Sequence, residues 1–568
     1  MKPEAPIYLD YAATTPTDPR VAALMARHLG VEGLFGNPAS THAYGRAARA
    51  AVEAARAQVA ALIGAPVGDI VFTSGATEAN NLGLLGAVRG ARKLAEAGGA
   101  AQARAAGRVG TTSAPVHLIT ARTEHKAVLD VCRQLEREGC RVTYLTPEAS
   151  GGIAPAQVAA ALEPRTALQP GTVLVSLMHA NNETGAITDI GACGALCRAH
   201  GALFHVDAAQ SAGKLPVDVL AMQVDLLSLT AHKLYGPKGI GALYVRGSCR
   251  ALLQPLMFGG GHERGLRSGT LPVHQIVGFG LACELGGAQM AAESARLAPL
   301  RAQLWNGLSD LPDVLCNSPS GSSLPGILNV SFCGIEGESL LFGLQELALA
   351  SGSACNSDSD EPSYVLRALG RDRETAQSSL RFSLGRGTTA ADIERTVAAV
   401  RREVLRLRSV AGTDTWAASA PASSAAATGA AAAEVDTAIT SVTAEAGARE
   451  QGTWVRLTLA VRAGVIHSAQ FQVYGCPQTV QVCDWLSDQL AGRPLTSLAP
   501  PTGEAPAGVQ PSKPSQTSQT SQTRVGGPRD WARTLGVPEE RLTRLLVIED
   551  ALQGAVQGAV QAALRNQT

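Results

Sequence analysis

The chain has 568 residues, and this length predicts about two to four domains. Its 48 lysine and arginine residues balance 48 aspartate and glutamate residues, so no overall charge attracts nucleic acid or an anionic membrane. The first residues lack the apolar core of a signal peptide, and no uncharged run is long enough to span a bilayer. We therefore expect a cytoplasmic protein that binds neither nucleic acid nor membrane.

Eleven cysteines are scattered along the chain without a paired framework. An odd number of separate thiols fits a reducing compartment better than a set of disulfides. Cys193 and Cys197 lie one helical turn apart, but no second pair lies near them. We therefore expect most of the cysteines to be small buried side chains and not metal ligands. Cys355 is treated separately because its neighbours are polar.

The first 408 residues alternate apolar runs with alanine-rich helical segments, which is typical of an α/β protein with a largely parallel sheet. The candidate strands are 70–73, 116–120, 142–145, 172–176, 203–207, 224–229 and 241–245. Several of these strands end in polar clusters, and ligands of open α/β sheets gather beyond the carboxyl ends of the strands. Between them, residues 86–115 predict a helix followed by a surface loop.

The segment that follows is a smaller α+β unit, with a strand predicted at 327–332 and an amphipathic helix at 390–408. Alanine, serine and threonine then dominate residues 409–451, which predicts a flexible linker.

A separate domain is predicted over residues 452–568. Alternating apolar and polar residues at 453–461 and 465–474 flank a turn and predict a hairpin. Residues 500–528 repeat Ser-Gln-Thr and predict a disordered insert, whereas leucine and valine at helical spacing predict a closing helix over 538–564.

Two polar clusters follow the first strands. Ala76 and Thr77 lie in a Ser-Gly-Ala-Thr turn that opens a helix, where exposed N–H groups and a hydroxyl suit a phosphate, although ordinary helix caps share this pattern. His125 follows the next strand. Its imidazole suits stacking on a planar ring or carrying protons, although a lone histidine is more often structural.

Later clusters add an acid and an amine. Asp207 ends a strand, where its carboxylate would keep a pyridine nitrogen protonated unless it only caps a helix. Asn181 and Gln210 are suited to donate hydrogen bonds to a phenolic oxygen on the same ring. Lys233 follows a buried strand and precedes a Gly-Pro-Lys-Gly turn, a setting in which burial lowers a lysine pKa and makes its amine a nucleophile. The alternative is a lysine that only solvates a loop.

These parts follow one another in the order expected of a pyridoxal-phosphate enzyme, and over residues 7–405 the chain resembles the cysteine desulfurases of iron–sulfur cluster assembly. The motifs that carry the resemblance are YLDYAATTP at 8–16, GNPASTH at 36–42, TSGATE at 73–78, TEHKAVL at 123–129, HVDAAQS at 205–211, AHKLYGPKG at 231–239, GGGHERGLRSGT at 259–270, SGSAC at 351–355 and LRFSLGR at 380–386.

The resemblance implies a fold-type-I pyridoxal-phosphate transferase. Its large domain would span about 18–278, and its small domain would combine the N-terminal segment with about 279–408. It also implies a homodimer that converts L-cysteine to L-alanine and passes the sulfur to an iron–sulfur scaffold protein or another acceptor. On this basis Lys233 holds the cofactor covalently and moves the α-proton, His125 stacks on the ring, and Asp207 fixes the ring nitrogen.

The remaining roles also come from the resemblance. Gln210 and Asn181 would tune the ring oxygen. The phosphate ligands would be Ala76, Thr77, Thr230 and His232, joined by Thr270 of the partner subunit. Arg381 would bind the substrate carboxylate, for which a guanidinium fork is well shaped, and Asn37 would assist it.

Cys355 would accept the sulfur. Its loop is rich in glycine and serine, which suits movement between the cofactor and an outside partner, and the thiolate would attack the sulfur of the bound cysteine to leave a persulfide. A buried structural thiol would not have such polar neighbours. No metal-ligand set is predicted, although Cys355 is a candidate for contributing to a cluster in transfer.

Residues 450–565 resemble more faintly the scaffold protein on which iron–sulfur clusters are built. The similarity lies in GVIHSAQFQVYGC at 464–476 and LLVIEDAL at 545–552, but Thr543 and Arg544 stand where that family has a histidine–cysteine pair. A cluster needs several converging ligands. We therefore expect a degenerate scaffold, with three roles open: docking, accepting sulfur at Cys476, or stabilising the enzyme.

Two other functions are weighed against the desulfurase. One is a selenocysteine lyase or another pyridoxal-phosphate β-lyase, because the same cofactor supports several eliminations. The other is an interaction protein with a vestigial site, which the presence of Lys233, His125, Asp207, Cys355 and Arg381 disfavours.

Overall fold

The computed structural model describes residues 5–105, 116–163, 173–351, 361–411, 439–449, 452–498, 525–538 and 541–565. Cys355, the loop predicted before residue 116 and most of the predicted insert lie outside these residues. The chain divides into two compact units. Unit 1 comprises residues 1–331, 346–372 and 379–398, and unit 2 comprises 332–345, 373–378 and 399–568.

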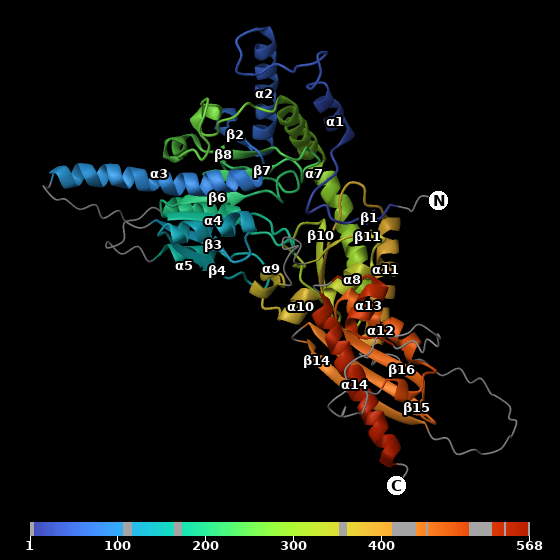
Figure 1. Cartoon of the computed structure of the whole chain (residues 1–568). Coiled ribbons are helices and arrows are strands. Elements are labelled where there is room, and N and C mark those ends of the chain that lie inside the picture. The colour runs from blue at the N-terminus through green and yellow to red at the C-terminus, as the bar shows by residue number, and fades with distance from the viewer. Residues whose placement is uncertain are drawn as a thin grey trace, which may run out of the picture. The chain divides into compact units, whose positions relative to one another are not determined.

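The centre of unit 1 is a seven-stranded sheet with the order β2-β8-β7-β6-β5-β3-β4 (Figure 1). Its strands are β2 (Ile70–Thr73), β3 (His117–Ala121), β4 (Arg141–Leu145), β5 (Val173–Met178), β6 (Leu203–Asp207), β7 (Leu226–Thr230) and β8 (Gly241–Val245). Strand β8 is antiparallel to both of its neighbours, and the other pairs are parallel. The predicted mostly parallel α/β sheet is confirmed.

Helices cover both faces of this sheet because its strands are buried on both sides. They are α1 (Pro19–Ala26), α2 (Ala43–Leu62), α3 (Ala76–Ala105), α4 (Lys126–Arg137), α5 (Pro155–Leu162), α6 (Ile190–Ala199) and α7 (Val273–Leu308). Successive strand residues alternate between two cores: Leu118 packs in the core of α3 and α4, whereas Ile119 packs in the core of α2, α5, α6 and α7. The strands therefore read as continuous apolar runs.

A second, four-stranded sheet has the order β12-β13-β10-β9. Its strands are β9 (Val314–Cys316), β10 (Ile327–Phe332), β12 (Ala350–Ser351) and β13 (Ser379–Ser383), while β1 (Ile7–Tyr8) pairs with β11 (Leu347–Ala348). Helices α9 (Tyr364–Ala368) and α11 (Ala390–Ala411) follow. The strand predicted at 327–332 and the helix predicted from 390 are confirmed.

Unit 2 contains a three-stranded antiparallel sheet of β14 (Thr440–Ala448), β15 (Thr453–Arg462) and β16 (Val465–Tyr474). Its helices are α8 (Gly337–Gly343), α10 (Arg373–Gln377), α12 (Pro477–Leu490), α13 (Pro528–Leu535) and α14 (Leu542–Arg565). The predicted hairpin and closing helix are confirmed. The C-terminal segment, residues 439–565, contacts α8 within this unit. The Ser339 hydroxyl donates to the carbonyl of Gly475 at 2.7 Å, and Arg541 pairs with Glu338 at 3.2 Å.

The predicted linker does not hold over 440–448, where β14 forms. The segment reads Thr-Ser-Val-Thr-Ala-Glu-Ala-Gly-Ala, in which Val442 is the one strongly apolar residue, so small side chains weaken the alternation expected of a strand. Its stability comes from pairing with β15 along its whole length. None of the described helices combines the length and apolar character needed to cross a bilayer.

Candidate active site

A cavity of about 540 Å³ in unit 1 gathers most of the predicted site residues. Those that line it are Ala76, Thr77, His125, Asp207, Gln210, Thr230, His232, Lys233 and Arg381. They come from the carboxyl ends of β6 and β7, from the start of α3, from the start of α4 and from β13. The strand ends therefore collect the ligand-binding side chains, as in other open α/β sheets.

Lys233 lies in the short connection between β7 and β8. Ten residues are too few for a crossover to a parallel strand, so the chain turns back as an antiparallel pair. Thr15 holds this turn, because its hydroxyl donates to the carbonyl of His232 at 2.8 Å and accepts from the backbone N–H of Tyr235 at 2.8 Å. The backbone on both sides of Lys233 is therefore fixed.

Burial and neighbouring cations lower the pKa of three basic side chains in this region. Burial, with a contribution from the charge of Lys233, lowers the pKa of His232 to about 4. The same two causes lower the pKa of His125 below its usual value. Lys214 is half-buried, and desolvation together with the charges of Lys233 and Arg381 lowers its pKa to about 7.

Asp207 ends β6 with its side chain turned toward the cavity-lining helix. Its carboxylate accepts hydrogen bonds from the amide of Asn80 at 2.8 Å and from the backbone N–H of Ala209 at 2.9 Å. Asn80 also lines the cavity, and its amide oxygen has no hydrogen-bond partner among the described residues. The carboxylate is thus held in one orientation, with its charge kept at the cavity wall.

Arg381 is buried in β13, with 4 % of its surface exposed. Its guanidinium donates to the carbonyl of Asn182 at 2.9 Å and to the carboxylate of Asp10 at 2.7 Å. Its Nε has no partner within the described part of the chain. The side chain is therefore oriented in advance and keeps a donor for an anion.

Three predicted site residues do not line this cavity. Asn181 is buried, and its amide oxygen accepts from the backbone N–H groups of Glu183 and Thr184, each at 2.9 Å. Thr270 is exposed, and Asn37 lines a separate cavity of about 250 Å³. Cys355 lies outside the described residues.

Sequence reasoning missed Asn80, Asn182, Asp10 and Lys214. Asn80 lies one helical turn after Thr77. Lys214 lies four residues after Gln210, and its ammonium donates to the side-chain oxygen of Gln210 at 3.2 Å. Helical spacing from the predicted residues was the available signal for Asn80. Asp10 lies within the YLDYAATTP motif and Asn182 follows Asn181, but neither position indicated by itself that its group would contact Arg381.

Comparison with known proteins gives the family. Residues 7–396 match the model described as aminotransferase class-V. The cysteine desulfurase IscS of Pectobacterium atrosepticum is 53% identical over 404 residues, which are 71% of this chain and 94% of that protein. The chain belongs to the cysteine desulfurases of the class-V aminotransferase family. The corresponding IscS protein of Escherichia coli is 52% identical over the same share of both chains.

Solved structures agree with the fold of this desulfurase. A NifS-like protein is 32% identical with a TM-score of 0.60, covering 71% of this chain and 99% of its own. DndA from Streptomyces lividans is 40% identical with a TM-score of 0.52, covering 66% of this chain and 99% of its own. The predicted fold-type-I architecture is confirmed.

The family depends on pyridoxal phosphate, and the cavity of this desulfurase fits that cofactor. The start of α3 offers N–H groups to a phosphate, and Asp207 offers a negative charge to a ring nitrogen. The Asn80 oxygen and Arg381 Nε are buried polar atoms without a hydrogen-bond partner in the described ranges, and a bound group would satisfy them.

Replacing Asp207 with asparagine is expected to lower turnover about 100-fold or more. The substitution keeps the size of the side chain but removes a buried negative charge that lines the cofactor site. Breaking a buried ion pair, here between Asp207 and a protonated ring nitrogen, costs about 3–5 kcal/mol. Steady-state alanine formation measures the effect. Asp189→Asn is the matched control, since that carboxylate only caps α6. An unchanged rate for Asp207→Asn would contradict the assigned role.

Glu183 makes the stability of the desulfurase depend on pH. Burial raises its folded-state pKa from 4.5 to about 7, although the Ser363 hydroxyl donates to it. The folded state therefore binds more protons than the unfolded state between these two values, and stability falls as the pH rises through them. Glu183→Gln removes this penalty and is expected to raise the free energy of unfolding by about 1–3 kcal/mol at pH 8 but not at pH 4.

Urea unfolding at the two pH values measures the difference. Glu148→Gln replaces an exposed glutamate and serves as the control. If Glu183→Gln changed stability equally at both pH values, ionisation of Glu183 would not be the cause.

Proposed function

We propose that this chain converts L-cysteine to L-alanine and leaves the sulfur as a persulfide on Cys355. The observation that supports this most strongly is the single cavity that joins Lys233, Asp207 and Arg381 in a chain of the desulfurase family. The cavity therefore offers an amine, a carboxylate and a guanidinium to one amino-acid substrate and its cofactor.

Pyridoxal phosphate, when bound, supplies an electron sink for the bonds around the α-carbon of an amino acid. Lys233 holds the cofactor and moves the α-proton at its Nζ. Asp207 keeps the ring nitrogen protonated, and His125 covers the ring and relays protons. Arg381 binds the substrate carboxylate as a charge-assisted fork, while Asp10 and the Asn182 carbonyl keep its guanidinium in place.

The phosphate is bound at the start of α3 by Ala76 and Thr77, with Thr230 and His232 from the lysine turn. These four residues line the same cavity. Gln210 and Asn181 act around the ring oxygen, although the amide of Asn181 also fixes its own turn.

Cys355 completes the reaction. Its thiolate attacks the sulfur of the substrate cysteine, a sulfur–sulfur bond forms, and the carbon–sulfur bond breaks. The electron pair of that bond stays with the three-carbon skeleton, which takes up protons and leaves as alanine. The sum is cysteine plus one enzyme thiol giving alanine plus one enzyme persulfide, so no external oxidant or reductant is needed.

A single turnover with L-cysteine in the absence of reductant tests the proposal. We expect alanine and persulfide in equal amounts, and mass spectrometry of alkylated peptides should place the additional sulfur on Cys355. Alanine with no persulfide on any peptide would instead favour a lyase that releases its sulfur directly.

The desulfurase is proposed to act as a cytoplasmic homodimer. Thr270 does not line the cavity of its own chain, and this supports its reaching the cavity of a second copy. Sedimentation of the purified protein should give twice the mass of one chain, and a monomer with full activity would refute the assignment of Thr270.

The C-terminal segment is proposed to be a degenerate scaffold that has a docking role and assembles no cluster. Cys476 is fully buried, and its thiol lies 3.3 Å from the hydroxyl of Thr479. No group of three or more histidine, cysteine or acidic side chains suited to a metal is found among the described residues. The sulfur would then pass to a separate scaffold protein or another acceptor. Visible absorption from a cluster after reconstituting the full chain with iron and sulfide would contradict this.

A further inference from the structure

Glu78 is an acidic side chain in an unexpected place. It lies in the first turn of α3 and lines the cavity, where the proposed function puts a phosphate. Hydrogen bonds from Arg267 and Ser74 outweigh the effect of burial and lower the pKa of Glu78, so its carboxylate is charged at neutral pH. A negative charge beside a phosphate site opposes binding of the phosphate unless another group neutralises it.

The carboxylate of Glu78 shapes the turn that opens α3. It accepts a hydrogen bond from the backbone N–H of Ser74 at 2.7 Å. This bond closes the segment from Ser74 to Glu78, in which Gly75 has a φ of 158° and lines the cavity. The acid therefore has a positioning role that a neutral helix start would lack.

Arg267 supplies the neutralising charge. Its Nε donates to one carboxylate oxygen of Glu78 at 2.8 Å and its NH2 group donates to the other at 3.3 Å. The two side chains are 17% and 18% exposed, so the pair is largely screened from solvent. A bidentate fork of this kind fixes both partners in geometry as well as in charge.

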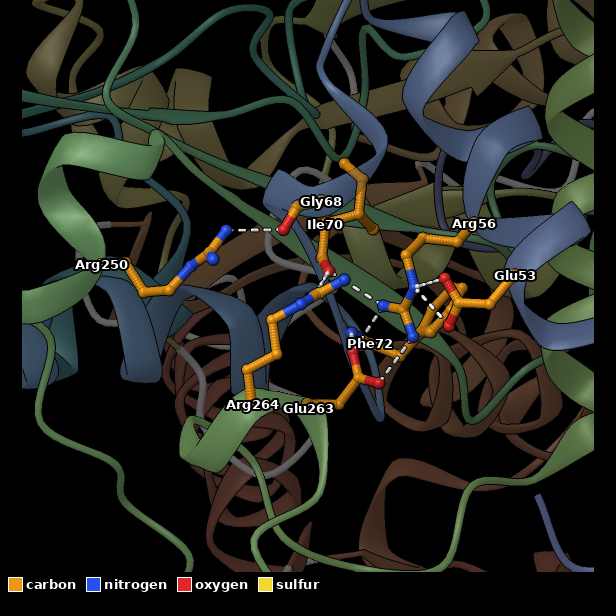
Figure 2. Close-up of polar contacts among 8 residues, drawn as sticks. All are labelled: Glu53, Arg56, Gly68, Ile70, Phe72, Arg250, Glu263 and Arg264. Atoms are coloured by element: carbon orange, nitrogen blue, oxygen red, sulfur yellow. Dashed lines mark hydrogen bonds and ion pairs between the residues drawn. The ribbon is translucent and has the colours of Figure 1, made fainter. Parts of the chain in front are cut away.

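The loop that carries Arg267 is itself anchored by a buried ion pair. The guanidinium of Arg56 donates to both oxygens of Glu263, at 2.7 and 2.8 Å, and the backbone N–H of Phe72 in β2 donates to the same carboxylate at 2.7 Å (Figure 2). Arg56 and Arg264 also both donate to the carbonyl of Ile70 (Figure 2).

This ion pair holds the loop in a strained backbone conformation. Glu263 and Arg264 have φ values of 49° and 59°, in the left-handed region that residues other than glycine rarely adopt. Such a conformation persists only when the surroundings enforce it. Because Glu263 binds the backbone of β2 and Arg267 binds the turn after β2, the loop reaches the same strand end at two points.

We propose that Arg267 and Glu78 are positioning residues for the cofactor phosphate: Glu78 shapes the turn that binds it, and Arg267 cancels the charge of Glu78 so that a dianion is accepted. The inference rests on the proposed cofactor site. It assigns to the 259–270 loop a function within its own subunit, in addition to carrying Thr270.

Binding of two forms of the cofactor to the apo form of the full-length protein tests the inference. Pyridoxal phosphate carries the dianion and pyridoxal lacks it. We expect Arg267→Gln to weaken the affinity for pyridoxal phosphate about tenfold or more and to leave the affinity for pyridoxal within about twofold, because only the phosphate meets the uncompensated Glu78 carboxylate. Arg267→Lys, which keeps the charge, should lose less.

The double variant Glu78→Gln with Arg267→Gln separates charge from structure. It removes both charges, so we expect it to recover most of the affinity that Arg267→Gln loses. Arg250→Gln is the matched control. Arg250 donates to the carbonyl of Gly68 (Figure 2), pairs with Asp69 and does not line the cavity.

Three results would overturn the inference. The first is an Arg267→Gln variant that binds pyridoxal phosphate as tightly as the unsubstituted protein. The second is an Arg267→Gln variant that loses equal affinity for pyridoxal and for pyridoxal phosphate. The third is a double variant that binds pyridoxal phosphate as weakly as Arg267→Gln does. If the unsubstituted protein bound neither form of the cofactor, the proposed function itself would fail, which is a different outcome.

Discussion

Replacing Lys233 with alanine is expected to lower alanine formation by at least about 10³-fold and to remove the covalently held cofactor. The turn between β7 and β8 brings Lys233 to the cavity that Asp207 also lines, and Thr15 fixes the backbone on both sides of this lysine. The shortened side chain leaves the cavity wall intact, so the loss measures the amine and not the fold. Alanine formation and the visible absorption of protein-bound cofactor report the two effects separately.

Lys214, which is half-buried near the same turn, is not expected to replace Lys233. Lys214 does not line the 540 Å³ cavity, and its ammonium donates to the side-chain oxygen of Gln210. Lys93→Ala removes an exposed lysine of α3 and should leave both readouts unchanged. Substantial alanine formation by Lys233→Ala would show that another group moves the α-proton.

Several strands of the seven-stranded sheet could be predicted closely because they are buried on both faces. The ranges 203–207 and 241–245 coincide with β6 and β8, since each is an apolar run bounded by turns. Residues at the strand ends, such as Asp207 and Lys233, could therefore be placed together without coordinates. The carboxyl edge of the sheet gathers them from distant parts of the chain.

Side-chain direction within turns could not be predicted in this way. In the Asn-Asn-Glu-Thr turn, Asn181 uses its amide oxygen to hold the backbone, and Asn182 lines the cavity. Both asparagines have the same chemistry in the sequence. Asn80 was missed for a related reason, because its partner Asp207 is 127 positions away and only the fold brings them within 2.8 Å.

The C-terminal segment shows the limit of composition as a guide. Residues 440–448 have the small side chains of a linker, yet Val442, Ala444 and Ala446 pack against the core of unit 2 from a paired strand. Strand formation there depends on a neighbour and not on the strand's own residues. Later residues of the C-terminal segment, Gly475 and Arg541, contact helix α8, and no local sequence pattern indicates these contacts.

The cysteines among the described residues are poor candidates for the nucleophile. In the described residues they are buried or half-buried, and none is exposed. Burial raises the pKa of Cys193 and of Cys197 to about 12, and it also raises the pKa of Cys316 and Cys483. A thiol that stays protonated near neutral pH attacks a sulfur slowly.

Replacing Cys355 with alanine is therefore expected to lower cysteine turnover by about 10³-fold or more and to abolish persulfide formation. No thiolate would then attack the substrate sulfur, so the carbon–sulfur bond would stay intact even with the cofactor bound. The absorption of the bound cofactor should be unchanged, which separates this variant from Lys233→Ala. Cys333→Ala, which removes a half-buried thiol, is the control and should retain turnover. Alanine release by Cys355→Ala at the rate of the unsubstituted protein would mean that the enzyme is a lyase that needs no sulfur acceptor of its own.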